Sequence, residues 1–359
     1  MNRAVKLVIP IIIFAVAAGV LWFTQEQEDE QMPIPSPQII AENLRIPWEV
    51  AFLPNGDLLV TERPGTLKRI GQDQKQYPIT GVRHQGEGGL LGLALHPRFA
   101  DNHWLYLYLT IEQGGVLQNQ VERYRLVDDN LIERTVIIDK IPAANNHDGG
   151  RIAFGPDGYL YITTGDAGKS SLAQDTNSLA GKILRLRDDG TTPTDNPFGN
   201  PVYSFGHRNP QGLAWDKRGQ LWATEHGRSG VLSGLDELNL IKKGGNYGWP
   251  TIQGDEKKAG LLNPIVHSGA TTTWAPAGLT FTAGALYFGG LRGEAVYRAE
   301  IGSDGVTISK LSALYQGQFG RIRAVVASAE KYLYITTSNT DGRGDPHAGD
   351  DKIIRLNLP

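Results

Sequence analysis

A short hairpin pattern recurs six times along the chain and constrains the fold more than any other feature of the sequence. Each copy has an apolar triplet, a turn and a second apolar triplet, as in Ile152-Ala153-Phe154 followed by Leu160-Tyr161-Ile162. The turn between these triplets is Pro156-Asp157-Gly158, a strong signal for a β-hairpin. The other first triplets begin at Val50, Leu93, Leu213, Leu279 and Val325.

The spacing of the copies predicts the architecture. The leucines that open the second triplets stand at 58, 105, 160, 221, 286 and 333, at intervals of 47, 55, 61, 65 and 47 residues. A period of roughly 40 to 50 residues with four strands per unit is typical of a β-propeller, and longer intervals leave room for loops. We therefore predict an all-β fold, a six-bladed β-propeller over residues 38–359. A β-sandwich with coincidental similarity between the copies is the alternative.

The two ends of the propeller region are predicted to meet. The run Lys352-Ile353-Ile354-Arg355-Leu356 reads as a strand that closes the last blade, beside the early run Gln38-Ile39-Ile40. Such closure removes exposed sheet edges.

Composition excludes several classes of function. The 359 residues include 44 Gly and 20 Pro, which favours many short strands joined by turns. The formal net charge of -3 lacks the basic excess that nucleic-acid binding requires, so no nucleic-acid partner is predicted. The chain has no cysteine, and any metal must therefore be held by oxygen or imidazole ligands.

The N-terminal segment is typical of exported proteins. Arg3 and Lys6 precede an apolar run over residues 7–23, and an acidic patch follows it. We predict that residues 1–24 are a signal peptide or a membrane anchor and that residues 25–37 are a flexible linker. Ala15-Val16-Ala17 offers a cleavage pattern, but the apolar run continues past it, so an uncleaved anchor is favoured over cleavage. The predicted location is periplasmic or extracytoplasmic, with a tether to the inner membrane if residues 7–23 are retained.

Hairpin geometry sorts polar residues by face of the propeller. Turns such as Asn55-Gly56 lie on one face, and residues that precede a first triplet or follow a second triplet lie on the other. The residues at these open ends are Glu87, His147, Asp166, Arg208, Asn209, Glu225, His226, Arg292, Arg321 and Arg323. Single arginines on loops are usually solvated. Four from three blades, however, predict a surface that binds a flat ligand with several carboxylates.

His147 and Asp166 stand at the same end of the central hairpin and can face each other. A histidine held by a carboxylate suits a general base, because its unperturbed pKa of about 6.5 lies near working pH and the carboxylate fixes its tautomer. The alternative interpretation is a loop histidine beside an aspartate that caps a turn.

A second polar group runs from Glu225 to Pro250. It contains Glu225-His226-Gly227-Arg228, then Asp236-Glu237, and then a glycine-rich stretch around Tyr247. Carboxylates, amides and backbone carbonyls are hard oxygen ligands, which suit calcium better than magnesium or zinc. Solvated acidic loops are the alternative.

Four stretches resemble one known family. They are Asn146 to Arg151, Gly206 to Gly212, Asp236 to Pro250 and Arg321-Ile322-Arg323. Together they resemble the soluble dehydrogenases of aldose sugars that depend on pyrroloquinoline quinone (PQQ), the glucose/sorbosone dehydrogenase family. The resemblance implies a six-bladed propeller with PQQ in its central mouth and a bridging calcium ion. It also implies oxidation of aldose sugars at the anomeric C1 hydroxyl to the lactone, with hydride transfer to PQQ and electrons passed to an external acceptor such as a quinone, cytochrome or dye.

The same resemblance implies roles for individual residues. By position, His147 would be the base, Asp166 would orient it and Arg208 would stabilise charge that develops on the quinone oxygen. Contacts with the cofactor are implied for Glu87, His147, Arg208, Asn209, Arg292, Arg321 and Arg323. The carbonyls of Gly227 and Arg228 would bind the bridging calcium, and Asp236, Glu237 and Tyr247 match a second, structural calcium site.

The chain also departs from the family pattern. Glu87 stands where the glucose-type members have glutamine, Arg292 where they have lysine, and Arg228 where they have proline. The blade insertions are shorter than in those enzymes, which favours a pocket for aldoses in general over one for glucose alone. Two alternatives remain: a calcium-dependent propeller lactonase or other hydrolase, and a binding propeller without enzymatic activity.

Overall fold

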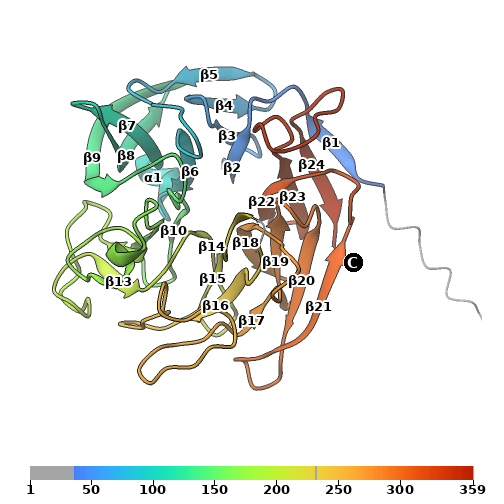
Figure 1. Cartoon of the computed structure of the whole chain (residues 1–359). Helices are drawn as coiled ribbons and strands as arrows, with labels where there is room; N and C mark the ends of the chain where they lie inside the picture. The colour runs from blue at the N-terminus through green and yellow to red at the C-terminus, as the bar shows by residue number, and fades with distance from the viewer. Residues whose placement is uncertain (1–35, 231–232, 359) are drawn as a thin grey trace, which may run out of the picture. The chain divides into compact units, whose positions relative to one another are not determined.

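The computed structural model describes residues 36–230 and 233–358. In this part of the chain, twenty-four strands form six antiparallel sheets of four strands each. Figure 1 shows the sheets as blades around a common axis, with β2, β6, β10, β14, β18 and β22 innermost. The predicted six-bladed β-propeller is confirmed. The predictions for the export segment concern residues 1–35, which lie outside the described residues, and the domain bounds remain predictions.

The first three blades follow one another along the chain. Blade 1 contains β2 (Pro47–Phe52), β3 (Leu58–Glu62), β4 (Thr66–Ile70) and β5 (Lys75–Pro78). Blade 2 contains β6 (Leu90–Leu95), β7 (Trp104–Gln113), β8 (Val116–Val127) and β9 (Asn130–Pro142), with the short helix α1 (Phe99–Asn102) between its first two strands. Blade 3 contains β10 (Ile152–Phe154), β11 (Leu160–Thr164), β12 (Lys182–Leu186) and β13 (Val202–Phe205), with the 3-10 helix η1 (Ser170–Gln174) after β11.

The last three blades include the one that closes the ring. Blade 4 contains β14 (Pro210–Trp215), β15 (Leu221–Glu225), β16 (Glu237–Ile241) and β17 (Val266–His267). Blade 5 contains β18 (Pro276–Thr282), β19 (Ala285–Gly290), β20 (Val296–Ile301) and β21 (Ile308–Leu314). Blade 6 contains β22 (Ile322–Ala327), β23 (Tyr332–Thr337) and β24 (Ile353–Asn357), and its outer strand is β1 (Gln38–Ala41) from the start of the propeller.

Closure of the ring follows the prediction from the sequence. β1 pairs antiparallel with β24, with Gln38 opposite Arg355 and Ile39 opposite Ile354. The first and last strands of the propeller therefore share one blade, and pairing covers the edge of β24 that the last blade would otherwise expose.

All six predicted hairpins pair as expected. In blade 1, Val50 lies opposite Val60, and in blade 3, Ile152 lies opposite Ile162. The turns between the paired strands use glycine where the backbone needs a positive φ, which is 90° at Gly56 and 78° at Gly158. These turns lie at one end of the blades, so the opposite ends of the inner strands collect the polar residues.

The core explains why the triplets are continuously apolar. Six clusters of buried side chains each lie between two neighbouring blades. Along β3, Leu58 and Val60 pack towards blade 6, whereas Leu59 packs towards blade 2. Because successive side chains of a strand point to opposite faces, a sheet held between two others needs apolar residues at every position. This arrangement rules out the β-sandwich alternative.

No helix in the described ranges 36–230 and 233–358 has the length and hydrophobicity that a membrane span requires.

Candidate active site

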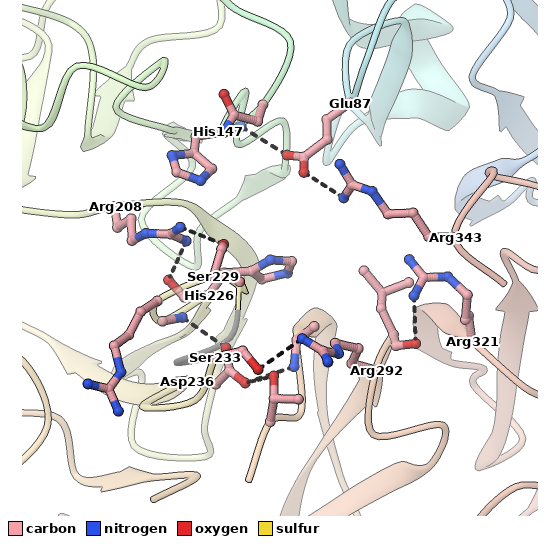
Figure 2. A pocket seen from close by; sticks show the side chains of 17 residues that line it. Glu87, His147, Arg208, His226, Ser229, Ser233, Asp236, Arg292, Arg321 and Arg343 are labelled. Atoms are coloured by element: carbon pink, nitrogen blue, oxygen red, sulfur yellow. Dashed lines mark hydrogen bonds and ion pairs between the residues drawn. The ribbon is translucent and has the colours of Figure 1, made fainter. Parts of the chain in front are cut away.

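A cavity of about 410 Å³ lies at the open ends of the hairpins, on the face that the sequence predicted (Figure 2). Its lining includes five arginines and two carboxylates: Arg208, Arg228, Arg292, Arg321, Arg343, Glu87 and Asp236. Arginines therefore exceed carboxylates by three in a chain whose net charge is negative. Guanidinium groups donate to carboxylates in pairs of parallel hydrogen bonds, so this lining is suited to an anionic ligand.

His147 and Asp166 face each other at the cavity wall. Nδ1 of His147 lies 2.7 Å from Oδ1 of Asp166, while Nε1 of Trp249 and the N–H of Gly168 also donate to this carboxylate, each at 2.8 Å. Burial on its own raises the pKa of Asp166, but the hydrogen bond from His147 and the other donors outweigh it and hold the pKa below its ordinary value. An ionised Asp166 accepts the Nδ1 proton, so we assign the free lone pair of the neutral ring to Nε2.

The backbone of His147 is held in an unusual conformation. Its φ is 62°, in the left-handed region, and its N–H donates to Oε2 of Glu87 at 2.9 Å. The next glycine, Gly149, also has a positive φ, and a Cβ there would lie 2.6 Å from the carbonyl oxygen of Thr163. Asn209 supports this loop, because its Oδ1 accepts the Gly149 N–H at 3.0 Å. Non-glycine residues adopt such a φ only where their surroundings enforce it.

Arg208 approaches the cavity in a fixed position. Its Nη2 donates to Oγ of Ser229 at 2.8 Å, its Nη1 donates to the carbonyl of His226 at 3.3 Å, and its backbone N–H donates to the carboxylate of Glu225. The guanidinium also lies 5.4 Å from the centre of the Trp249 ring. Burial lowers the pKa of Arg208 from its ordinary value, although the nearby carboxylates oppose this shift. The guanidinium is a preorganised positive group that lines the same cavity as His147 (Figure 2).

The other predicted arginines differ in depth. Nη1 of Arg292 donates to Oγ of Ser233 at 2.9 Å. Nη2 of Arg321 donates to Oδ2 of Asp341 at 2.8 Å, and its Nη1 donates to the Leu291 carbonyl at 3.0 Å. Arg323 does not line the cavity. It donates to Oε1 of Gln211, lies 5.7 Å from the centre of the Trp48 ring, and has a pKa that burial lowers to about 9.

Five of the seven residues expected to contact a cofactor therefore line the cavity: Glu87, His147, Arg208, Arg292 and Arg321. Asn209 and Arg323 lie outside this lining, Asn209 in contact with the His147 loop and Arg323 deeper along the axis.

The residues expected to bind calcium fall into two groups. Gly227, Arg228 and Asp236 line the main cavity, whereas Glu237 and Tyr247 border a much smaller one beside it. The Asp236 carboxylate accepts four hydrogen bonds, from Oγ1 of Thr273 and from the N–H groups of Gly227, Trp274 and Ala275, at 2.7 to 2.9 Å. Within the described ranges, no group of three or more acidic or histidine side chains is arranged to hold a metal ion.

Glu237 is half-buried, and its carboxyl forms no ion pair with any other described residue. Burial raises the pKa of Glu237 to about 8, and the neighbouring carboxylate of Glu225 adds to this effect. Glu225 lies directly opposite Glu237 across the β15–β16 pair. A bound cation would relieve the repulsion between these two carboxylates.

Sequence reasoning missed two kinds of lining residue. Arg343 was not found because it comes six residues after β23 (Tyr332–Thr337), in a loop rich in glycine and aspartate. Ser229 and Ser233 were also missed. The hairpin rule assigns all three residues to the open end because they follow the second strand of their hairpin, but it does not say which residues of a loop reach the cavity.

The molecule contains a second histidine–carboxylate pair close to the first. Nδ1 of His207 lies 2.8 Å from Oε2 of Glu225, and its Nε2 lies 2.9 Å from Oγ of Ser204. The ring stacks on Tyr247 with centres 4.7 Å apart, and no part of His207 is exposed. Both ring nitrogens are used inside the protein.

The family model for glucose/sorbosone dehydrogenases matches residues 44–354. The chain belongs to this family. It is 32% identical over 343 residues to the aldose sugar dehydrogenase YliI of Escherichia coli K12, covering 85% of this chain and 90% of that protein. It is also 32% identical to quinoprotein glucose dehydrogenase B of Acinetobacter calcoaceticus over 261 residues, which are 62% of this chain and 54% of that protein.

The fold of this chain matches that of a solved structure. It is the PQQ-bound form of the aldose sugar dehydrogenase from Streptomyces coelicolor, with a TM-score of 0.83 and 39% identity over 90% of this chain and 99% of that one. The comparisons confirm the predicted family and identify the chain as an oxidoreductase.

Proposed function

We propose that this protein is a PQQ-dependent aldose sugar dehydrogenase that oxidises the C1 hydroxyl of an aldose to the lactone. The observation that carries the proposal is the His147 ring, whose Nδ1 is held by Asp166 at 2.7 Å while the ring lines a cavity rich in arginine. The PQQ-bound relative from Streptomyces coelicolor and the aldose sugar dehydrogenase of Escherichia coli support the choice of cofactor and substrate class.

The cavity fits PQQ in charge and in size. PQQ is a flat quinone that carries several carboxylates, and the lining offers three more arginines than carboxylates. The volume of about 410 Å³ lies within the range of roughly 300 to 1,000 Å³ that small-molecule sites occupy. Arg292 is exposed and uses one nitrogen on Ser233, which leaves its other N–H groups for a ligand. Glu87, Arg208, Arg292 and Arg321 would surround the cofactor, with Asn209 and Arg323 supporting the site from outside its lining.

His147 would transfer the proton, and Asp166 and Arg208 would stabilise the charges that develop. Nε2 of His147 takes the proton of the sugar C1 hydroxyl as the C1–O bond becomes a carbonyl. PQQ, when bound, supplies the two-electron oxidant that accepts the hydride from C1. The ionised Asp166 stabilises the imidazolium that forms at His147, and the fixed guanidinium of Arg208 stabilises negative charge that develops beside it.

We also propose calcium as a second cofactor. The Gly227 carbonyl accepts no hydrogen bond from the residues that the structure describes, and the Arg228 carbonyl accepts only a long one of 3.4 Å from Gly234. Backbone carbonyls of this kind are hard oxygen ligands that suit calcium. Since four donors already fill the Asp236 carboxylate, Asp236 would fix the Gly227 backbone. Glu237 and Tyr247 remain the proposed ligands of a second calcium.

The setting of the reaction follows from the sequence. An external acceptor, such as a quinone or a cytochrome, would reoxidise the cofactor. The apolar run over residues 7–23 favours a periplasmic or extracytoplasmic location, with a membrane tether if it is retained.

The test is dye-linked oxidation of a panel of aldoses by the purified full chain, with PQQ and calcium added together and each omitted in turn. The proposal predicts turnover that requires PQQ and is strongest with both additions. Hydrolysis of a lactone with calcium alone would favour the hydrolase alternative. Absence of PQQ binding would contradict the proposal and favour a binding propeller.

A further inference from the structure

Glu87 joins two parts of the cavity wall. It lies in the loop between β5 and β6, where its Oε2 accepts the backbone N–H of His147 at 2.9 Å. Its Oε1 accepts Nη1 of Arg343 at 2.8 Å, from the loop between β23 and β24 at the far end of the chain (Figure 2). One carboxylate thus links the residue proposed as the base to an arginine that neither the sequence motifs nor the family resemblance assigned.

The negative charge of Glu87 opposes the binding of a ligand that carries carboxylates. Burial on its own raises the pKa of the Glu87 carboxyl, but the imidazole of His226, the guanidinium of Arg343 and the N–H of His147 outweigh burial and lower the pKa to about 2. Glu87 is therefore ionised at neutral pH. Like charges close together in a partly buried site repel each other strongly, because water screens them poorly.

The guanidinium of Arg343 compensates the negative charge of Glu87. Its side chain is 59% exposed at the rim, whereas that of Glu87 is 16% exposed. The guanidinium reaches Glu87 from the solvent side and does not form an ion pair with any other carboxylate among the described residues. The pair is neutral as a unit, so the positive excess of the cavity remains available to a ligand.

We propose that Glu87 and Arg343 act as a matched pair, in which Glu87 positions the backbone of His147 and Arg343 cancels the charge of Glu87 so that the cavity accepts an anionic cofactor. This inference rests on the proposed function. It gives Glu87 the role of a positioning residue and explains how a carboxylate can stand where the glucose-type enzymes have a neutral glutamine. A glutamine at this position would accept the same backbone N–H and would need no arginine.

The charge half of the proposal is tested by PQQ affinity, measured through quenching of tryptophan fluorescence in the full chain with calcium present. R343M leaves an uncompensated carboxylate and should weaken PQQ binding about 10- to 100-fold. E87Q leaves the guanidinium of Arg343 without its carboxylate partner and should bind PQQ at least as tightly as the unmodified protein. The double variant E87Q/R343M should recover most of the affinity lost in R343M, because no charge is left to compensate.

R83M is the matched control for this series. Arg83 pairs with Glu112 at 3.1 Å in an exposed ion pair, and neither residue lines the cavity. Its loss should leave PQQ affinity unchanged. A double variant E87Q/R343M that binds PQQ as weakly as R343M would overturn the charge-compensation role.

The positioning half is tested by comparing E87Q with E87M. Both remove the charge, but only glutamine retains an oxygen that can accept the His147 N–H. At saturating PQQ and sugar, E87M should have a kcat at least about tenfold below that of E87Q, with a similar KM for the sugar. Equal kcat values in the two variants would show that Glu87 does not position His147.

The outcomes separate this inference from the function on which it rests. If the unmodified protein does not bind PQQ, both fall together. If it binds PQQ and R343M binds equally well, the proposed function stands and the matched pair is wrong. Thermal unfolding of every apoprotein variant identifies any loss of affinity that comes from misfolding, since an ion pair at the rim contributes little to stability.

Discussion

Two of the four histidine–carboxylate pairs among the described residues have the same local geometry and different surroundings. His147 lies 2.7 Å from Asp166 and His207 lies 2.8 Å from Glu225, and in both pairs the carboxylate meets Nδ1. Nε2 of His207 is bound to Ser204, and its ring is stacked on Tyr247 without any exposure. The His147 side chain is 11% exposed and lines the arginine-rich cavity.

The comparison shows that a histidine–carboxylate pair does not by itself mark a base. The carboxylate orients the ring in both places, and the second nitrogen decides what the ring does. Where that nitrogen is bound inside the protein, as in His207, the pair is part of the framework. Where no described residue bonds it and a cavity lies beside it, as in His147, the ring can exchange a proton with a substrate.

Replacement of His147 should have the largest effect on turnover. H147Q removes the nitrogen that takes the proton and should lower kcat about a thousandfold, within the range of roughly 10² to 10⁴ for general-base catalysis. PQQ affinity and the unfolding midpoint should change little, because the cavity keeps its arginines. Steady-state dye-linked assays, PQQ titration and chemical denaturation measure the three quantities. Turnover within tenfold of the unmodified protein would exclude His147 as the base.

Replacement of His207 should instead affect stability. H207F can keep the stacking on Tyr247 but leaves Glu225 and Ser204 without their ring partner in a fully buried site. The expected loss is about 3 kcal/mol in the free energy of unfolding, measured by urea denaturation. The kcat per folded molecule should fall less than about tenfold, since Glu225 still accepts the Arg208 N–H. A thousandfold loss of kcat without loss of stability would reverse the assignment of the two pairs.

Replacement of Asp166 should have a smaller effect on turnover than replacement of His147. D166N keeps the shape of the side chain but removes the charge that fixes Nδ1–H and stabilises the imidazolium. We expect kcat to fall about a hundredfold and PQQ affinity to remain within a few-fold. An unchanged kcat in D166N would mean that orientation of His147 comes from Glu87 and the backbone alone.

Asp148, next to His147, is a buried carboxyl that forms no ion pair with any described residue. Burial raises the pKa of Asp148 to about 7, and its Oδ2 has no partner among the described residues. Between about pH 4 and pH 7 the folded state holds a proton that the unfolded state has released, so this carboxyl lowers stability as pH rises through that window. D148N removes the ionisation and should be more stable than the unmodified protein by up to about 4 kcal/mol at pH 8 and similar to it at pH 4. Urea denaturation measures the free energy of unfolding of both proteins across this range. A difference between the two proteins that stays constant from pH 4 to pH 8 would contradict the raised pKa of Asp148.

The sequence predicted the fold well because the hairpin pattern is local. The apolar triplets report burial on both faces of each sheet, and the antiparallel geometry of the hairpin assigns each flanking residue to one end of its blade. The hairpin geometry therefore assigns His147, Asp166 and Arg208 to the open end from the sequence alone.

The remaining residues of the site depended on features that a hairpin does not encode. Arg321 and Arg323 stand two residues apart at the start of β22, so Arg323 lies about 7 Å deeper along the axis, beside Gln211 and below the cavity. Arg343 reaches the cavity through a long loop whose path the sequence does not fix. The saturation of the Asp236 carboxylate depends on backbone N–H groups from a distant segment, Trp274 and Ala275, which no motif reveals.

Hydride removal from C1 with His147 as the base is tested by the rate at which an aldose reduces PQQ bound to the full chain in a single turnover. This rate is compared for a sugar with hydrogen at C1 and one with deuterium at C1. We expect the deuterated sugar to react more slowly in the unmodified protein and H147Q to lose this reduction almost entirely. Reduction at equal rates with both sugars, or at an undiminished rate in H147Q, would contradict this mechanism.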